Sequence, residues 1–527
     1  MSDTNLPVLI AGGGPVGLAL AVELGLRDIP CTLVEKRDGK LTVPRMSQVS
    51  TRGMEFCRRW GIAEEVRNAV WTNTHTLDFV YLTSLTGDEI ARLKVPSYQE
   101  RGPLDYTPEG PCHCPQIYFD PILAELAGSF PSVTLRYNTA LESFEQEGET
   151  IHAHLVDSVT GATETVTARY LVGCDGPGGV VREALGIELG GLGGIANSIN
   201  IFFRSPDLSE LHDKGWARFY RCIDESGSWG EMIAIDGREL WRLTIYDHKE
   251  GEIDADSYLR RLAGRDFPYE ILSVLPWERR DYLAEHLRRS NVFIAGDTAH
   301  QVSPTGGLGM HTGVCEAVNL GWKLAAMIEG WGGPALLDSY EIECRPMAAY
   351  NVEISTRSFH NIVGLPGSRS VEDVFPKDDL EAANVQLRNL TIPDFTKVQF
   401  IFENSPVCVY DGTEPDAAEM RKGIQSSQAG SRAPHGWVAE DETIFDRFGR
   451  DFTLLRFGNA PEDAGEIVQA AADRGLPLAV LDIADEDLTA VYEKRLVLVR
   501  PDGHVAWRGD VCPSDAGTVI DRVRGAA

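Results

Sequence analysis

Basic residues are few in this sequence relative to acidic ones. Its 527 residues include 49 Lys and Arg against 79 Asp and Glu, which gives a formal net charge of −30. A surface of this sign repels nucleic-acid phosphates and anionic lipid headgroups. We therefore expect no nucleic-acid partner and no polybasic contact with a membrane.

Paired cysteines are absent as well. The ten cysteines are scattered, with no Cys-x-x-Cys pair and no zinc-type spacing. Cys112-His113-Cys114 could be a fragment of a metal site, but no second cluster of ligands accompanies it. We expect no metal centre, and we interpret most cysteines as small buried residues in a reducing, cytoplasmic compartment.

Long hydrophobic runs are limited to one segment, Leu6 to Val22, which is uncharged and largely apolar. No Lys or Arg precedes it, so the basic region of a signal peptide is missing. Three glycines and a proline interrupt its middle, where a spanning helix would weaken. A buried strand, a glycine turn and a buried helix explain the run better, and we expect no membrane span.

The same segment contains a dinucleotide-binding fingerprint. A strand at 7–11 precedes Gly12-Gly13-Gly14-Pro15-Val16-Gly17, a helix follows, and a second strand ends at Glu35. Gly12 is expected to make the tight turn, Gly14 to let the backbone approach a pyrophosphate, and Gly17 to let helix and strand pack closely. The alternative is a simple glycine-rich turn.

Further residues of this unit are expected to contact the dinucleotide. Pro15 and Val16 open the helix, whose free N–H groups and positive dipole end favour phosphate. Glu35, 18 residues after Gly17, is placed to accept hydrogen bonds from a ribose, and Lys36 adjoins it. The sequence thus predicts that a dinucleotide binds at this end of the chain.

A second fingerprint lies some 280 residues later. Gly296-Asp297-Thr298-Ala299-His300 is followed by Pro304 and by Gly306-Gly307-Leu308-Gly309. Apolar residues from Val314 to Ile328 recur at helical spacing, so a buried helix is expected to start near Thr312. Two such motifs, far apart in the sequence, indicate one long cofactor that binds to both of them, namely FAD. For His300 we expect a structural bond to backbone rather than general-base chemistry.

Three further stretches extend the pattern. Arg45 begins a segment expected to be helical through Ile62, where its guanidinium can clamp a pyrophosphate or stay exposed. Gln116 precedes a helix at 121–127, and Asp175-Gly176 follows the apolar run at 170–174. With these stretches the chain resembles the single-component flavin-dependent aromatic hydroxylases, the family of p-hydroxybenzoate hydroxylase and phenol hydroxylase.

The resemblance implies roles for several residues. Asp297 would hold the ribityl hydroxyls, and Gly307, Gly309, Met310 and His311 would line the isoalloxazine ring. Arg45, Gln116 and Asp175 would complete the FAD site, and Pro304 and His311 are the candidates nearest the chemistry. Three positions depart from the family's pattern: Gly179 replaces a serine, His311 replaces an asparagine, and Ser47 stands where phenol hydroxylase has an aspartate base.

The middle of the chain alternates in strand fashion from about 195 to 285 and is rich in aromatic residues. A sheet with an aromatic face can simply be a core. In the resembled family this sheet covers the flavin and lines the substrate pocket. On that ground Arg218, Tyr220 and Tyr246 are the candidate substrate residues.

The expected fold is α/β, with a Rossmann-like FAD-binding domain, a mixed-sheet substrate domain and a C-terminal thioredoxin-like domain. The last domain contains only Cys512 and so has no redox pair. Its role would be structural or dimer-forming, which allows a homodimer. The expected limits are 1–190 and 285–360 for the FAD-binding domain, 191–284 with parts of 70–115 for the substrate sheet, 361–430 for a connecting segment and 431–527 for the C-terminal domain.

The resemblance implies hydroxylation of a phenolic or related small aromatic substrate. NADH or NADPH would reduce FAD, O2 would add at flavin C4a, and the resulting hydroperoxide would oxygenate the ring. The alternatives are epoxidation or N-oxygenation of a non-phenolic substrate on the same fold, or a non-catalytic FAD-binding module. The sequence names no group that would deprotonate the substrate.

Overall fold

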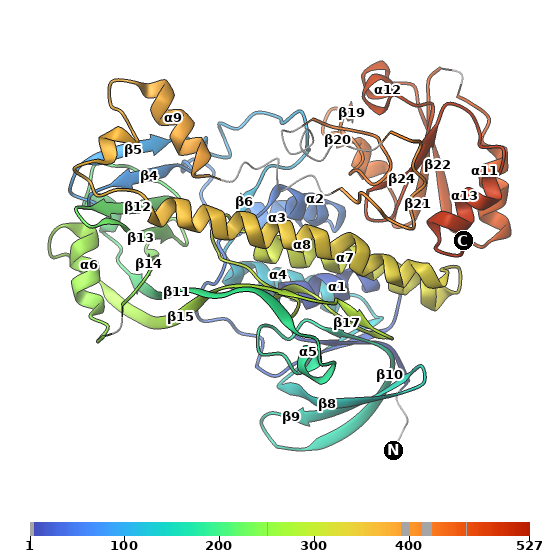
Figure 1. Cartoon of the computed structure of the whole chain (residues 1–527), viewed down its shortest axis with the longest axis horizontal. Helices are drawn as coiled ribbons and strands as arrows, with labels where there is room; N and C mark the ends of the chain where they lie inside the picture. The colour runs from blue at the N-terminus through green and yellow to red at the C-terminus, as the bar shows by residue number, and fades with distance from the viewer. Residues whose placement is uncertain (1–4, 250, 392–400, 414–423, 460) are drawn as a thin grey trace.

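The computed structural model describes residues 5–249, 251–391, 401–413, 424–459 and 461–527. Figure 1 shows the chain as a sheet-and-helix body with the C-terminal domain at one end and strands β4 and β5 toward the other. No helix in the described part of the chain has both the length and the apolar character needed to cross a membrane.

The first sheet is built around the N-terminal strand. Its strand order is β16-β17-β10-β1-β2-β7, and β8 and β9 extend it beside β10. The contacts of β1 with β2 and β10, of β2 with β7, and of β10 with β17 are parallel. The strands are β1 (Asn5–Ala11), β2 (Cys31–Glu35), β7 (Val133–Tyr137), β8 (Thr139–Glu147), β9 (Thr150–Asp157), β10 (Thr163–Gly173), β16 (Arg288–Arg289) and β17 (Val292–Ile294).

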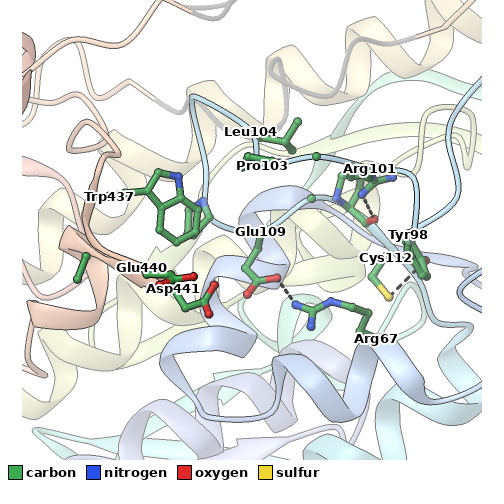
Figure 2. Close-up of a pocket in the computed structure, with 15 residues that line it drawn as sticks. Arg67, Tyr98, Arg101, Pro103, Leu104, Glu109, Cys112, Trp437, Glu440 and Asp441 are labelled. Atoms are coloured by element: carbon green, nitrogen blue, oxygen red, sulfur yellow. Dashed lines mark hydrogen bonds and ion pairs between the residues drawn. The ribbon is translucent and has the colours of Figure 1, made fainter.

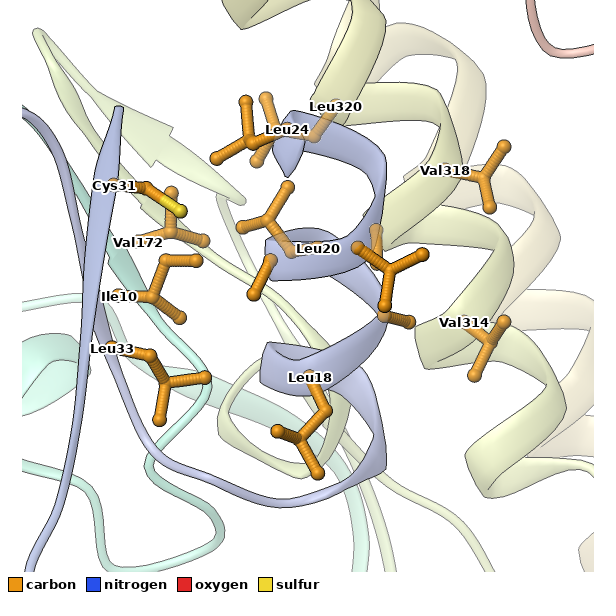
Figure 3. Packing of buried hydrophobic residues seen from close by; sticks show 14 of the residues in the cluster. Ile10, Leu18, Leu20, Leu24, Cys31, Leu33, Val172, Val314, Val318 and Leu320 are labelled. Carbon is orange, nitrogen blue, oxygen red and sulfur yellow. The ribbon is translucent and has the colours of Figure 1, made fainter. Parts of the chain in front are cut away.

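Two helices form the core against this sheet. Helix α1 (Pro15–Gly25) lies between the sheet and helix α7 (Gly309–Glu329), and Figure 3 shows its leucines packed between strand residues and α7. Leu18, Leu20 and Leu24 are all buried, and each contributes roughly 1.5–3 kcal/mol through the apolar surface removed from water. The apolar run from Leu6 to Val22 is therefore a strand, a turn and a helix of the core.

Four further helices pack beside the first sheet and beside α1 and α7. They are α2 (Thr51–Arg59), α3 (Ala63–Asn68), α4 (Gln116–Ser129) and α5 (Val180–Ala184). Strands β3 (Gln48–Val49) and β6 (Cys112–His113) pair beside them. The helix expected from Arg45 begins only at Thr51, because Ser50 caps it by accepting a hydrogen bond from the Gly53 N–H.

The second sheet includes the region from about 195 to 285 where the sequence predicted strands. Its strand order is β18-β15-β11-β14-β13-β12-β4-β5. One face packs on helix α6 (Ala255–Ala263) and contains the core residues Tyr220, Met232, Trp241 and Leu243. The strands are β4 (Phe79–Leu82), β5 (Glu89–Leu93), β11 (Leu189–Arg204), β12 (Phe219–Asp224), β13 (Gly227–Ala234), β14 (Leu240–Ile245), β15 (Glu270–Ala284) and β18 (His300–Gln301).

Helix α8 (Pro334–Val363) crosses the molecule (Figure 1). At its start the Gly333 N–H donates to Arg524 O at 2.7 Å, so this end meets the C-terminal residues of the chain. Near its other end Phe359 packs edge-on against Tyr246, just after β14. Helix α9 (Leu380–Asn389) then lies beside β5.

The C-terminal part is a four-stranded sheet in the order β22-β21-β23-β24. Pro501-Asp502-Gly503 lies in the turn that joins β23 and β24, which pair antiparallel. The elements are β19 (Trp437–Ala439), β20 (Glu442–Thr443), β21 (Phe452–Phe457), α11 (Gly465–Asp473), β22 (Leu478–Ile483), α12 (Glu486–Tyr492), β23 (Leu496–Val499), β24 (Val505–Gly509) and α13 (Ala516–Val523).

A buried charge cluster joins this domain to the helices behind the first sheet. Glu343 of α8 accepts hydrogen bonds from Lys323 of α7 at 2.7 Å and from both terminal nitrogens of Arg500 at 2.6 and 2.9 Å. Arg500 also donates to Asp502 at 2.6 Å. The cluster carries two positive and two negative side chains, so its buried charges balance.

Candidate active site

A cavity of about 860 Å³ runs from the start of α1 to one face of the second sheet. Fifteen of the residues singled out from the sequence line it, although they come from distant parts of the chain. They are Gly14, Pro15, Val16, Glu35, Lys36, Arg45, Gln116, Asp175, Arg218, Tyr246, Asp297, Pro304, Gly307, Gly309 and Met310.

The N-terminal glycines have distinct geometries. Gly12 has a φ of +113°, and a Cβ there would lie 2.2 Å from the Cys174 carbonyl oxygen. A Cβ on Gly17 would lie 2.0 Å from the Gly12 carbonyl oxygen, so this glycine permits close packing. Gly14, by contrast, has open space around it and faces the cavity. Gly12 and Gly17 shape the turn without lining the cavity.

Several groups beside this turn suit a phosphate and a ribose. Helix α1 has no side-chain cap at its N-terminus, so its first N–H groups remain available to an anion. The guanidinium of Arg45 is exposed in the cavity and pairs with no residue that the structure describes. Glu35 accepts hydrogen bonds from the N–H groups of Gly13 and Arg37, both at 2.9 Å, which fixes its carboxylate at the cavity wall.

Gln116 brings a carboxyl group that the sequence reasoning missed. Its Nε2 donates to Asp120 Oδ2 at 2.9 Å, one turn further along α4, and Asp120 also lines the cavity. Burial raises the pKa of the Asp120 carboxyl to about 7, and its bond to Gln116 offsets only part of that effect. The i, i+4 spacing on the helix was the signal that could have identified it.

Asp175 and Gly179 form a single local arrangement. The Asp175 carboxylate accepts hydrogen bonds from the Val181 N–H at 3.2 Å and from the Thr298 hydroxyl at 3.1 Å. A Cβ on Gly179 would lie 2.0 Å from Asp175 Oδ1. The carboxylate therefore fills the space that a side chain at position 179 would need, which accounts for glycine where the resembled family has serine.

Asp297 opens into the middle of the cavity. Its side chain is accessible from the cavity although it lies deep in the protein. This depth raises the pKa of its carboxyl above the ordinary value, and the nearby charges of His300 and Arg45 act in the opposite direction. A carboxylate that is open to the cavity can accept hydrogen bonds from a bound polyol.

His300 lies beneath this carboxylate and bonds to a side chain rather than to backbone. Its Nε2 is 2.8 Å from Glu316 Oε1, and Glu316 Oε2 accepts from the Gly296 N–H at 2.8 Å. Burial lowers the pKa of His300, but the Glu316 charge outweighs it, so the net pKa is raised. The pair supports the Gly296-Asp297 turn, as a structural role requires.

The start of α7 closes the next part of the cavity. Gly307 has a φ of +68° with open space around it, and Gly309, Met310 and Pro304 line the same wall. His311 is not among the lining residues. It is buried, with Nδ1 2.6 Å from the hydroxyl of Ser50, the cap of α2.

At the far end the cavity meets the second sheet, where strand alternation sorts the candidate substrate residues. Phe219 and Arg221 of β12 line the cavity, whereas Tyr220 points to the opposite face. The Tyr220 hydroxyl donates to Gly215 O at 2.7 Å and accepts from the Ala217 N–H at 2.9 Å. Tyr220 therefore does not reach the cavity, because side chains alternate between the two faces of a strand and its own face packs in the core.

The same alternation brings residues to the cavity that the sequence reasoning missed. Besides Arg218 and Tyr246, this end is lined by Phe79, Phe219, Arg221, Glu231, Ile233, Arg242, Ser358, Phe359, Ile362, Leu390 and Thr391. The last five belong to the end of α8 and to the residues that follow α9. The region that the sequence suggested as a connection thus forms part of the cavity wall.

A second cavity, of about 610 Å³, lies between the loop around Arg101 and the β19–β20 hairpin (Figure 2). Arg67 is paired with Glu109 there, and Arg101 donates to Pro111 O at 3.0 Å. None of the residues expected to bind a cofactor or substrate lines it. Cys112 does, but the described residues contain no group of three or more potential metal ligands.

Comparison with known families agrees with these motifs. Residues 5–355 match the family described as "FAD binding domain", and residues 426–527 match the family described as "Aromatic-ring hydroxylase, C-terminal". The chain belongs to the FAD-dependent aromatic-ring hydroxylases. FAD supplies the redox chemistry in this family, taking electrons from NAD(P)H and activating O2.

Relatives and solved structures match over nearly the whole chain. The tetracenomycin A2 monooxygenase-dioxygenase of Streptomyces glaucescens is 30% identical over 569 residues, covering 98% of this chain and 95% of that protein. The 4-methyl-5-nitrocatechol 5-monooxygenase of a Burkholderia species is 30% identical over 563 residues, with 99% and 97% covered. RebC with bound 7-carboxy-K252c is 37% identical, with a TM-score of 0.91 and 100% of both chains covered.

The family fixes the kind of enzyme and its cofactor. The chain is a flavoprotein monooxygenase with an α/β FAD-binding fold, as the sequence predicted. The relatives are named monooxygenases, which disfavours a non-catalytic module. The residues present also fit FAD: the open Gly14, the available Arg45 guanidinium and the Asp297 carboxylate face one cavity.

Proposed function

We propose that this monooxygenase hydroxylates a phenolic ring of an extended aromatic compound. The observation that carries the proposal is the continuity of one cavity, from the glycine turns of both FAD motifs to a sheet face lined by aromatic rings and arginines. A flavin at the start of α7 would therefore face a substrate on that sheet. The aromatic walls exclude water from the reacting ring, which protects reactive oxygen species from side reactions.

We assign the FAD-binding roles from the positions of the lining groups. The α1 N-terminus and Arg45 would hold the pyrophosphate, Glu35 and Lys36 the adenosine end, and Asp297 the ribityl chain. Gln116 and Asp175 lie along the same cavity, and Pro304, Gly307, Gly309 and Met310 would border the ring. His311 would act through Ser50 rather than by touching the ring.

The size and chemistry of the relatives' ligands support an extended substrate. RebC is described with 7-carboxy-K252c, and the Streptomyces relative is named for tetracenomycin A2. The Burkholderia relative is named for a single-ring catechol. The cavity here continues past the sheet to Phe359, Ile362 and Leu390, which gives room beyond one ring.

We also propose a cytoplasmic enzyme that binds no nucleic acid and forms a homodimer through its C-terminal domain. The net charge of −30 disfavours nucleic-acid phosphates. All ten cysteines are free, as a reducing compartment requires. We keep the domain limits of the sequence analysis as a proposal, and Ile362, Leu390 and Thr391 of the segment 361–430 line the proposed substrate pocket.

A turnover assay tests the function. The purified yellow protein is mixed with NADH or NADPH and a panel of phenols, naphthols and hydroxyanthraquinones, and cofactor oxidation and product mass are followed. We expect an aromatic that accelerates NAD(P)H oxidation to gain 16 mass units. If none of the panel alters the oxidation rate and no hydroxylated product forms, the proposal is wrong.

A further inference from the structure

One carboxylate of the second sheet lines the cavity but has no role in the proposed binding of FAD. Six carboxylates line the cavity, and four of them lie among the FAD-binding residues: Glu35, Asp120, Asp175 and Asp297. Glu278 is 44% exposed and pairs with Arg280 at 2.7 Å. Glu231 remains, at the centre of the sheet on β13.

Two neighbouring strands fix the orientation of Glu231. Its Oε2 accepts hydrogen bonds from the Tyr246 hydroxyl at 3.2 Å and from Arg221 Nε at 3.3 Å. Arg221 is held in turn by the Tyr81 hydroxyl on β4. Oε1 accepts no hydrogen bond from any residue in the described ranges, and the side chain is 17% exposed, so this oxygen is available within the cavity.

We infer that Glu231 is the catalytic base that takes the proton from the substrate hydroxyl, with Arg221 and Tyr246 as positioning residues. The inference rests on the proposed hydroxylation of a phenol. The substrate O–H bond breaks, a bond from hydrogen to Glu231 Oε1 forms, and the electron pair stays on the substrate oxygen. When the oxygenated ring becomes aromatic again, its C–H proton passes to water and Glu231 returns its own proton to the substrate oxygen, which regenerates the carboxylate.

The charges around Glu231 favour this transfer. Arg221 on β12 contacts Glu231, and the charges of Arg242 on β14 and Arg279 on β15 also act on it. Tyr81, Cys222 and Tyr246 are the other titratable groups that interact with it. Transfer moves one negative charge from Glu231 to the substrate and creates no new charge in the buried site. The arginines then stabilise the phenolate, which is the more nucleophilic form of the ring.

Glu231→Gln keeps the shape of the side chain and removes its basicity. For the aromatic that most accelerates NAD(P)H oxidation, we expect the wild-type yield of hydroxylated product per NAD(P)H to fall at acidic pH, because a general base acts only in its ionised form. We call this fall of the yield at acidic pH the acid limb, and we expect it to disappear in Glu231→Gln. We also expect the yield of Glu231→Gln at neutral pH to be about 100-fold lower than that of the wild type. Hydrogen peroxide should rise correspondingly, while FAD content stays normal.

A second readout does not depend on turnover. Binding of 4-nitrophenol is followed by difference absorbance, because its ionised form absorbs at longer wavelength. We expect 4-nitrophenol bound to the wild type to be more ionised than the free compound at the same pH, and Glu231→Gln to reduce that difference. Glu231→Asp should recover part of the acid limb. Glu239→Gln is the matched control, because Glu239 directly precedes β14, pairs with Arg204 at 3.2 Å and does not line the cavity.

The outcomes separate this inference from the proposed function. If no aromatic stimulates the wild type, the hydroxylase proposal fails before any variant is compared. If the wild type hydroxylates an aromatic but Glu231→Gln keeps the same acid limb and product yield, then Glu231 is not the base. Equal ionisation of 4-nitrophenol in both proteins, or its failure to bind the wild type, would likewise contradict the role.

Discussion

The buried charge cluster that attaches the C-terminal domain gives a stability prediction of defined sign. Lys323, Glu343, Arg500 and Asp502 are almost completely buried and together carry no net charge. Arg500→Met keeps much of the side-chain volume but removes one cation. Glu343 then keeps Lys323, whereas Asp502 is left with His504, whose pKa is lowered by burial, so one negative charge is left buried without compensation.

The expected loss is large because the remaining charge cannot reach water. Breaking a buried ion pair from one side typically costs about 3–5 kcal/mol. Arg500 donates two hydrogen bonds to Glu343 and two to Asp502, so four charge-assisted hydrogen bonds are lost together. We therefore expect Arg500→Met to lower the free energy of unfolding of the C-terminal domain by about 3–5 kcal/mol.

A double variant tests whether charge balance is the cause. Arg500→Met combined with Asp502→Asn restores neutrality, so we expect it to regain part of the stability lost in Arg500→Met alone. Urea unfolding followed by tryptophan fluorescence suits the measurement, since the Trp322 indole donates to Asp502 at 3.2 Å. Arg456→Met is the control in the same domain: Arg456 pairs with Asp482 at the surface and should contribute at most about 1 kcal/mol.

The result that refutes the reasoning is simple to recognise. If Arg500→Met loses no more stability than Arg456→Met, the cluster is not stabilising through its charges. If the double variant is less stable than Arg500→Met alone, uncompensated charge is not the reason for the loss, and the hydrogen bonds themselves matter more.

Three further predictions concern the FAD end of the cavity. Asp297→Ala should weaken FAD binding at least tenfold in a fluorescence titration of the apoprotein, and full occupancy at equal FAD would contradict its assignment to the ribityl chain. Gly17→Ala should destabilise the protein by about 1–3 kcal/mol, since its Cβ would meet Gly12 O at 2.0 Å, whereas Gly14→Ala should fold normally and only weaken FAD binding. The pKa of the Asp120 carboxyl is raised to about 7, so this group binds its proton more tightly in the folded apoprotein than in the unfolded chain. The free energy of unfolding should therefore fall as the pH rises from about 4 to 7, by up to about 4 kcal/mol. Asp120→Asn should flatten that dependence in thermal unfolding measured across this pH range; an unchanged slope would show that another group causes it.

The FAD end could be predicted from the sequence because its residues lie in short contiguous motifs. Gly12 to Gly17 form a turn whose geometry depends on neighbours within the same unit. Asp297 follows β17, Gly307 follows β18, and both lie shortly before α7. In such motifs the local chain geometry determines where each group points, so residue order alone was enough to predict groups that line one cavity.

The helix expected to begin at Arg45 shows the limit of that reasoning. The segment 44–50 is instead extended and pairs through β3 with β6, and α2 starts after the Ser50 cap. The pairing partner, Cys112-His113, lies some 60 residues later in the sequence. A strand pairing at that distance overrides local helical preference, and single-sequence reasoning contains no information about it.

The substrate end could be predicted as a sheet but not residue by residue. Tyr220 lies on the core face of the sheet. The sequence could not predict this, because strand alternation fixes the direction of each side chain only once the register of β12 is known. Its neighbours Phe219 and Arg221 face the cavity instead. Glu231 reaches the site only because β13 pairs with β12 and places it directly opposite Arg221. These contacts arise from pairing between strands, which composition does not reveal.

The structure indicates how the C-terminal domain contributes to the cavity, which its sequence alone did not reveal. It lacks a cysteine pair for redox chemistry, yet it contacts the helix whose first turn borders the cavity. Helix α7 begins at Gly309 in the cavity and continues to Trp322 and Lys323, where the buried cluster joins it to Asp502 and Glu343. A rigid helix transmits a displacement at one end to the other. Fixing α7 at Lys323 therefore restrains the Gly309 end, and a domain without redox function can still help to position the flavin.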